Sequence, residues 1–133
     1  MPHSKPLLIA LLVAASALAT AAAVAADQPV IGLITKTETN PFFVKMKEGA
    51  QAAANAKGAK LLSAAGKTDG DNAGQVTAIE NMIAGGAKTI LITPSDSKAI
   101  IPAIKKAQAK GVMFIALDSP TDPMEATDAT CLP

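Results

Sequence analysis

The sequence predicts an α/β fold, a parallel sheet with helices on both faces, and two observations lead to this prediction. Four short apolar runs lack polar alternation, as expected of strands that are covered on both faces. Between them lie three segments with an apolar face, as expected of amphipathic helices. Strands that alternate with helices through short connections form parallel sheets with right-handed crossovers.

The first strand and helix are marked by clear local signals. The apolar run at 30–34 predicts the first strand. Asn40 and Pro41 predict a helix start, because Asn accepts a bond from a free N–H of the first turn and Pro fits the first helical position. Gly58 predicts the end of this helix, and a weaker second strand follows at 60–64.

The second helix is expected to begin at Asp71 or Asn72, either of which can cap it. Its apolar residues recur at spacings of three and four, which places them on one buried side. Gly85 and Gly86 predict its end, and the run at 88–93 predicts the third strand.

The third helix is expected over 99–110, closed by Gly111. Pro102 lies inside this range and removes one backbone hydrogen bond, so the helix is expected to begin late or to have a distorted first turn. A fourth buried strand follows at 112–117 and ends on Asp118.

Residues 1–26 have the features of a cleaved signal peptide, which predicts export. An apolar run follows Lys5, and small residues at 23–25 fit the pockets of a signal peptidase, with cleavage after Ala25 or Ala26. A retained membrane anchor is the alternative, because the run is about long enough to cross a bilayer. Its alanine-rich second half inserts weakly, which favours cleavage.

Composition excludes several classes of function. The net charge is +1 with both signs interspersed, so no basic stripe predicts a nucleic-acid partner. Cys131 is the single cysteine, which rules out an intramolecular disulfide, and the single histidine, His3, lies in the signal segment and leaves no base to activate a thiol. The GxSxG, GxxxxGK and GxGxxG motifs and zinc-type His/Cys clusters are absent. We therefore expect no enzyme, no cofactor and no metal.

One enzymatic alternative rests on Asp96 and Asp118, which follow two predicted strands and could hold Mg²⁺ as in phosphoryl-transfer domains. That chemistry also needs acidic residues after the first strand. Thr35 and Lys36 stand there instead, which argues against it.

In open parallel sheets, ligands bind beyond the carboxyl ends of the strands. Three groups of residues are expected at that edge, one after each of the first, third and fourth strands: Lys36 with Thr37, Asn40, Phe42 and Phe43; Thr93 with Ser95 and Asp96; and Asp118 with Ser119. Donors, acceptors and aromatic faces suit a neutral polyhydroxylated ligand.

Each candidate also has a purely structural interpretation. Asn40 is expected to cap the first helix, and Asp96 or Ser97 to cap the third. Phe42 and Phe43 are adjacent, so one of them is expected to point away from the core. Asp118 has the strongest functional case, because a partly buried carboxylate without partners would be costly.

Several segments together resemble the periplasmic ribose-binding-like family of ABC importers, especially its fructose-type members. The resemblance covers about residues 28–125 and is carried by these motifs: Ile31-Gly32-Leu33-Ile34, Asn40-Pro41-Phe42-Phe43, Glu48-Gly49-Ala50, Leu91-Ile92-Thr93-Pro94-Ser95-Asp96-Ser97 and Ile115-Ala116-Leu117-Asp118. It implies one lobe of a type I periplasmic-binding-protein fold, in which two lobes close on a monosaccharide and present it to a membrane permease driven by an ATPase.

By position, the resemblance implies that this lobe binds its ligand through Lys36, Asn40, Phe42, Phe43, Thr93, Asp118 and Ser119. The Phe rings would stack on the sugar, and Asp118 would accept hydrogen bonds from its hydroxyls. Ribose binders of the family have a small hydroxyl residue, an Asn and an Arg where Lys36, Thr93 and Ser119 stand. A ketose or hexose such as fructose is therefore favoured over ribose.

The expected organisation is a signal peptide at 1–26, an N-terminal sugar-binding lobe at 27–126 and an atypical end at 127–133. The last segment shows neither periodicity nor turn signals, and the family would continue into a second lobe, so we expect a truncated, frame-shifted or fragmentary chain. A nonfunctional remnant and a sugar receptor for chemotaxis or sensor signalling are the alternatives. A sugar-responsive repressor is excluded, because an exported segment stands where its DNA-binding helices would be.

Overall fold

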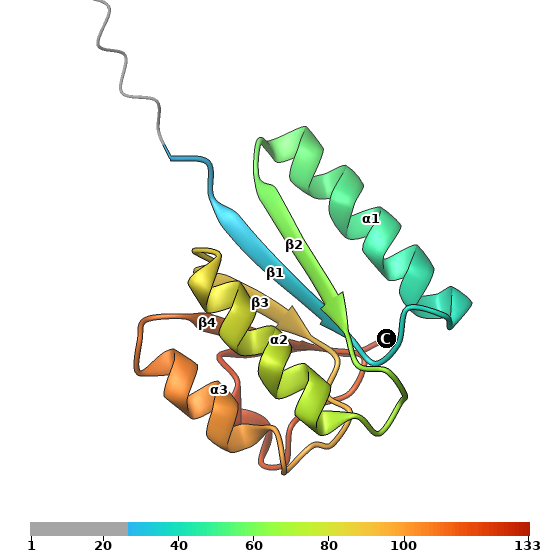
Figure 1. Ribbon diagram of the computed structural model, residues 1–133, viewed down its shortest axis with the longest axis vertical. Helices are drawn as coiled ribbons and strands as arrows, with labels where there is room; N and C mark the ends of the chain where they lie inside the picture. The colour runs from blue at the N-terminus through green and yellow to red at the C-terminus, as the bar shows by residue number, and fades with distance from the viewer. Residues whose placement is uncertain (1–26) are drawn as a thin grey trace, which may run out of the picture.

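A computed structural model describes residues 27–133, so the expected signal peptide lies outside the described residues. Figure 1 shows a parallel sheet with helices on both faces, and the predicted α/β class is confirmed. The elements follow one another in this order: β1 (Val30–Thr35), α1 (Pro41–Lys57), β2 (Lys60–Ala65), α2 (Asn72–Ala84), β3 (Thr89–Ile92), α3 (Ile101–Gln108), β4 (Met113–Leu117), the 3₁₀ helix η1 (Met124–Ala126) and β5 (Ala129–Cys131).

The strand order across the sheet is β2-β1-β3-β4-β5, and all neighbours pair in parallel. Helix α1 covers one face, whereas α2 and α3 lie together on the other (Figure 1). Leu33 and Ile34 are adjacent in β1 and point to opposite faces, yet both are 0 % exposed. Burial on both faces explains why this strand has an uninterrupted apolar sequence.

The main core lies between the sheet and the pair α2 and α3. Strand residues of one face interlock there with the apolar sides of both helices: Ile34, Ile90, Ile92 and Phe114 from the sheet, and Ala78, Ile79, Met82, Ile104 and Ala107 from the helices. Burial of these side chains is the main favourable term that holds the helices against the sheet. Over residues 27–133, no helix combines the length and apolar character that crossing a membrane requires.

The ends of α1 and α2 and the late start of α3 follow the local signals in the sequence, but α3 has no side-chain cap at Asp96 or Ser97 and ends at Gln108, before Gly111. Asn40 Oδ1 accepts a hydrogen bond of 2.9 Å from Phe42 N and so caps α1. Gly58, with φ 69°, ends this helix in the left-handed conformation that glycine adopts without strain. Of the two candidates for the α2 cap, Asp71 caps it, accepting from Gly74 N at 2.8 Å. Pro102 lies in the first turn of α3, which begins late, at Ile101, as predicted.

The segment at 127–133, whose sequence is atypical, contains a short strand. Ala129–Cys131 forms β5, which pairs with β4 and extends the sheet by one strand. Polar contacts hold it in place: Asp128 Oδ2 accepts hydrogen bonds from Phe114 N at 2.7 Å and from Gln108 Nε2 at 3.1 Å. A three-residue strand fixed by a neighbouring carboxylate has no apolar periodicity, which is why the sequence pattern did not predict it.

A first prediction concerns Gly66, in the loop that follows β2. A Cβ on this residue would lie 2.9 Å from Lys36 O and 3.1 Å from Thr68 O, both backbone atoms. Because backbone cannot easily move aside, Gly66→Ala should lower the free energy of unfolding by about 1–3 kcal/mol, measured by urea denaturation. Gly70→Ala in the same loop is the control, since its Cβ would meet nothing within 4 Å. Equal losses for the two variants would contradict this packing argument.

A second prediction concerns the pH dependence of stability. The hydrogen bond from Phe114 N, with a second from Gln108, lowers the pKa of Asp128 below its usual 3.8. A lowered pKa stabilises the folded chain above the unfolded value, and this stability is lost as the pH falls from about 3.8 through the folded value. Asp128→Asn should therefore destabilise the chain at pH 6 and lose less stability between pH 6 and pH 3 than wild type.

Urea unfolding at the two pH values checks this. Asp71 and Asp96 also have lowered pKa values, because backbone N–H groups bond to their carboxylates, so the variant should keep part of the acid dependence. The same slope for wild type and Asp128→Asn would show that Asp128 plays no part in it.

Candidate functional site

The candidate site lies at the carboxyl edge of the sheet, where β1, β3 and β4 end. Strand β1 has β2 on one side and β3 on the other, so the helices that follow β1 and β3 lie on opposite faces. Such a reversal of strand order opens a crevice at the edge of the sheet, and ligands of open α/β sheets bind there. All three groups of residues expected from the sequence follow these strands.

Lys36, Ser119 and Asp118 form a chain of polar contacts across this edge. Lys36 Nζ lies 3.4 Å from Ser119 Oγ, which in turn donates to Asp118 Oδ2 at 3.2 Å. All three residues are half-buried. The contacts join the loop after β1 to the loop after β4, although 83 positions separate Lys36 from Ser119.

Asp118 is held in an uncommon backbone conformation, with φ 63°. Its N–H donates to Cys131 O of β5 at 2.9 Å, and the next N–H, of Ser119, donates to Leu117 O at 2.6 Å. Asp tolerates the left-handed region better than most residues with a side chain. The backbone therefore turns at Asp118, directly after β4, and the Asp118 carboxylate lies beside the Ser119 hydroxyl.

The two adjacent Phe residues of α1 have different surroundings. Phe43 is 5 % exposed and Phe42 is 52 % exposed, and their rings meet edge to face with centroids 5.3 Å apart. Phe42 and Asp118 both line a hollow of about 180 Å³ at this edge. Its other lining residues are Met46, Leu117, Cys131, Leu132 and Pro133. The exposed ring of Phe42 and the carboxylate of Asp118 therefore line the same hollow.

The other two candidates are engaged within the protein. Asn40 Oδ1 serves as the α1 cap. Thr93 is fully buried, and its hydroxyl lies 3.9 Å from the Met46 sulfur. The structure therefore brings four of the seven residues, Lys36, Phe42, Asp118 and Ser119, to one accessible region, and it places Phe43 and Thr93 inside.

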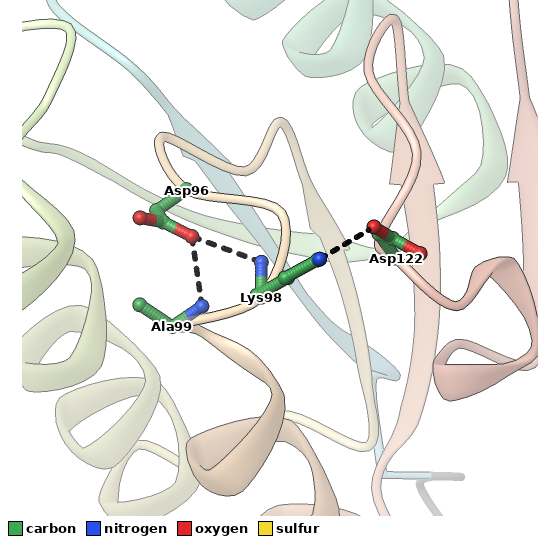
Figure 2. A network of polar contacts seen from close by, with 4 residues as sticks. All are labelled: Asp96, Lys98, Ala99 and Asp122. Atoms are coloured by element: carbon green, nitrogen blue, oxygen red, sulfur yellow. Dashed lines mark hydrogen bonds and ion pairs between the residues drawn. The ribbon is translucent and has the colours of Figure 1, made fainter.

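Asp96 has a structural role that Figure 2 shows. Its Oδ1 accepts from Ala99 N at 2.8 Å and from Lys98 N at 2.9 Å, which closes the turn ahead of α3 and lowers the pKa of the carboxyl. Lys98 Nζ forms an ion pair of 3.2 Å with Asp122, and Asp122 N donates to Ser97 O at 3.0 Å. These bonds tie the loop after β3 to the loop after β4.

Residues 27–133 contain no group of three or more His, Cys, Asp or Glu residues arranged to hold a metal ion. The accessible side chains are instead a cation, a carboxylate, a hydroxyl and an aromatic ring. Together they can donate and accept hydrogen bonds and cover an apolar face, as recognition of a small polyhydroxylated molecule requires.

Sequence reasoning missed Gln75, whose buried amide contacts the ends of β1 and β3. It lies three, four and seven positions before Ala78, Ile79 and Met82, so it shares their buried side of α2. A polar amide on an apolar helix face is the signal that could have found it. Met46 and Cys131 were missed as well, because only the folded chain places them in the lining of the hollow.

Comparisons with known proteins agree with this architecture. The family described as "Periplasmic binding protein domain" matches residues 31–131. The D-ribose/D-allose-binding protein of Pseudomonas aeruginosa is 36% identical over 99 residues, which are 73% of this chain and 31% of that protein. The ribose import binding protein of Escherichia coli is 36% identical over 111 residues, 83% of this chain and 37% of that protein. The chain thus spans about a third of the length of these curated relatives.

Solved structures give the same result. A solute-binding protein of Actinobacillus succinogenes with bound D-allose is 37% identical, with a TM-score of 0.67 over 71% of this chain and 33% of that one. A carbohydrate transporter solute-binding protein of Agrobacterium radiobacter in complex with D-arabinose is 29% identical, with a TM-score of 0.71 over 78% of this chain and 35% of that one. The resemblance inferred from sequence is therefore confirmed, and the chain belongs to the periplasmic binding protein domain family, with the type I fold of its sugar-binding members.

Proposed function

We propose that this chain is part of the periplasmic substrate-binding component of an ABC-type sugar importer and binds a monosaccharide at the carboxyl edge of its sheet. One observation carries the proposal: the hydrogen-bonded side chains of Lys36, Ser119 and Asp118 end at the hollow that Phe42 lines. Relatives of the same family are named for ribose and allose. The role is binding without chemistry, so it needs no cofactor and no metal.

The chemistry of these groups fits a sugar ring. A carboxylate can accept bonds from two hydroxyls, the Lys ammonium donates, and the Ser hydroxyl does both. The exposed ring of Phe42 can cover the C–H face of the sugar, which leaves the hydroxyls at its edge for Asp118 and Lys36. Asn40 Nδ2 is a further donor at the start of α1, since the cap uses only the side-chain oxygen. Thr93 and Phe43 support the site from beneath.

The proposed site is one half of a two-lobed cleft. The hollow is shallow, and burial of a sugar between two lobes is what removes its hydroxyls from competition with water. We infer that the N-terminal lobe comprises the expected residues 27–126 together with β5, which pairs with β4. We also infer that a second lobe supplies the other half of the site and that a membrane permease recognises the closed form. By itself, this lobe is expected to bind sugars only weakly, with a Kd of about 1–100 mM.

A ketose or hexose such as fructose remains the predicted ligand in preference to ribose. The support is that Lys36, Thr93 and Ser119 differ from the small hydroxyl residue, the Asn and the Arg that ribose binders of the family have at these positions. The relative that holds D-allose shows that a hexose is accepted within the family. Growth on the sugar and chemotaxis toward it would separate an importer component from a chemotaxis receptor, and a nonfunctional remnant would support neither.

A third prediction tests sugar binding directly. In an NMR titration of the ¹⁵N-labelled chain, D-fructose, D-allose or D-ribose should shift the non-proline amides of 36–43 and 117–121 with a Kd of about 1–100 mM, a free energy near −4 kcal/mol or weaker. Phe42→Ala should weaken the effect, whereas Val44→Ala, an exposed residue of the same helical turn outside the hollow, should not.

Uniform small shifts with no clustering at this edge would refute the proposed site. Submicromolar binding would refute the half-site argument, and a lower Kd for ribose than for fructose would refute the ketose preference.

A fourth prediction separates stability from binding at Asp118. Asp118→Asn should leave the thermal midpoint almost unchanged, because Asn also tolerates a φ of 63°, while weakening sugar binding about 2–10-fold through loss of the charged acceptor. Asp118→Ala should weaken binding and also lower stability by about 1 kcal/mol, because Ala does not favour this conformation. Thermal melts and the NMR titration measure the two effects. Unchanged sugar affinity in both variants would exclude Asp118 from the site.

A further inference from the structure

Gln75, in the first turns of α2, is a fully buried polar side chain, with 0 % of its surface exposed. Both the nitrogen and the oxygen of its amide form hydrogen bonds. Nε2 donates to Thr93 O at 2.9 Å and to Thr35 O at 3.1 Å, while Oε1 accepts from Ser95 N at 2.8 Å. All three partners are backbone groups at the carboxyl ends of β1 and β3, where the candidate site begins.

These bonds lie where the sheet itself stops holding the two strands together. The pairing of β1 with β3 ends at Ile34 and Ile92, and the last bond between them runs from Thr93 N to Ile34 O at 2.9 Å. Beyond it the chains diverge, since the helices that follow β1 and β3 lie on opposite faces. The Gln75 side chain extends from α2 to this point and links the two strand ends, beyond the last backbone hydrogen bond between them.

We propose that Gln75 is a positioning residue that sets the separation between the β1 and β3 ends and thereby the placement of Lys36 against the rest of the site. Lys36 directly follows Thr35, whose carbonyl the amide holds. The inference deepens the proposed function and rests on it. Gln75 has no exposed surface, so it acts through the backbone and not by touching a sugar.

The side-chain chemistry required at this position is narrow. Only an amide of this length can donate to two carbonyls and accept from an N–H at the same time. A Glu carboxylate would face two carbonyl oxygens with no proton to share. Met would fill the space, but it would leave Thr93 O and Ser95 N without the Gln75 amide and Thr35 O with only its bond of 3.3 Å from Gly66 N. Asn is one methylene shorter and cannot span the same three groups.

If Gln75 had only a packing role, its variants would affect the site no more than any other destabilising core substitution. A matched core variant therefore separates a packing role from a positioning role. Ile79 lies one turn further along the same side of α2, is 1 % exposed and belongs to the main core. Ile79→Ala should destabilise the chain by loss of packing without touching the strand ends. Its effects on the site therefore report what general destabilisation alone can do.

The fifth prediction compares Gln75→Met and Gln75→Asn with Ile79→Ala in the ¹⁵N-labelled chain. At temperatures set equally far below each melting midpoint, the Gln75 variants should speed hydrogen exchange of the Ser95 amide by about tenfold or more relative to Ile79→Ala. They should also shift the non-proline amides of 35–37 and 93–97 and weaken D-allose binding several-fold, whereas Ile79→Ala at matched stability should change the affinity less than about twofold.

Equal exchange rates and equal affinities for the Gln75 and Ile79 variants would overturn the proposal and leave Gln75 a packing residue. If Gln75→Met does not fold, the milder Gln75→Asn decides by the same two readouts. If wild type binds none of the three sugars at about 100 mM, the proposed function fails. The free energy of binding would then be weaker than about −1.5 kcal/mol, which is too small for specific recognition. The Ser95 exchange rate and the strand-end shifts then still support or overturn the positioning role.

Discussion

The double pairing of β1, with β2 on one side and β3 on the other, is the constraint on which the candidate site depends. Because the order reverses at β1, the chain must leave β1 and β3 toward opposite faces of the sheet, and the backbone between them cannot continue its ladder. That divergence creates the concave edge, and it also creates carbonyl groups that need other partners. The amide of Gln75 meets this need from within the core.

The side of the site formed by the loop after β4 depends on a second set of bonds. Strand β5 is only three residues long, yet Cys131 O receives the Asp118 N–H and so helps to hold the turn that carries the carboxylate. Asp128 in turn secures β5 through Phe114 N and Gln108. The placement of Asp118 therefore depends on residues that follow it in the sequence by ten positions or more, and the segment after η1 belongs to the lobe as a structural part.

Fold class, strand positions and helix ends were predictable because they follow from local patterns: apolar runs, the Asn40 cap, Gly58 and the late start forced by Pro102. Strand β5 was not, because a long-range carboxylate contact stabilises it and leaves no periodic trace. The strand-end location of the candidate residues was predictable from the rule for parallel sheets. Two features needed the folded chain, because they depend on packing between elements: the exposure of Phe42 rather than Phe43, and the burial of Thr93 against Met46.

The backbone at Asp118 has a consequence for how such a site can diversify. A φ of 63° favours Asp, Asn or Gly at that position, of which only the first two carry a side chain able to bond a hydroxyl. Lys36 and Ser119 are under no such restriction, since both have ordinary backbone geometry. During evolution, one acceptor would then stay constant while its two neighbours change. A lineage that changes its preferred sugar would accumulate substitutions at 36 and 119 around a hydrogen-bond acceptor that is kept at 118.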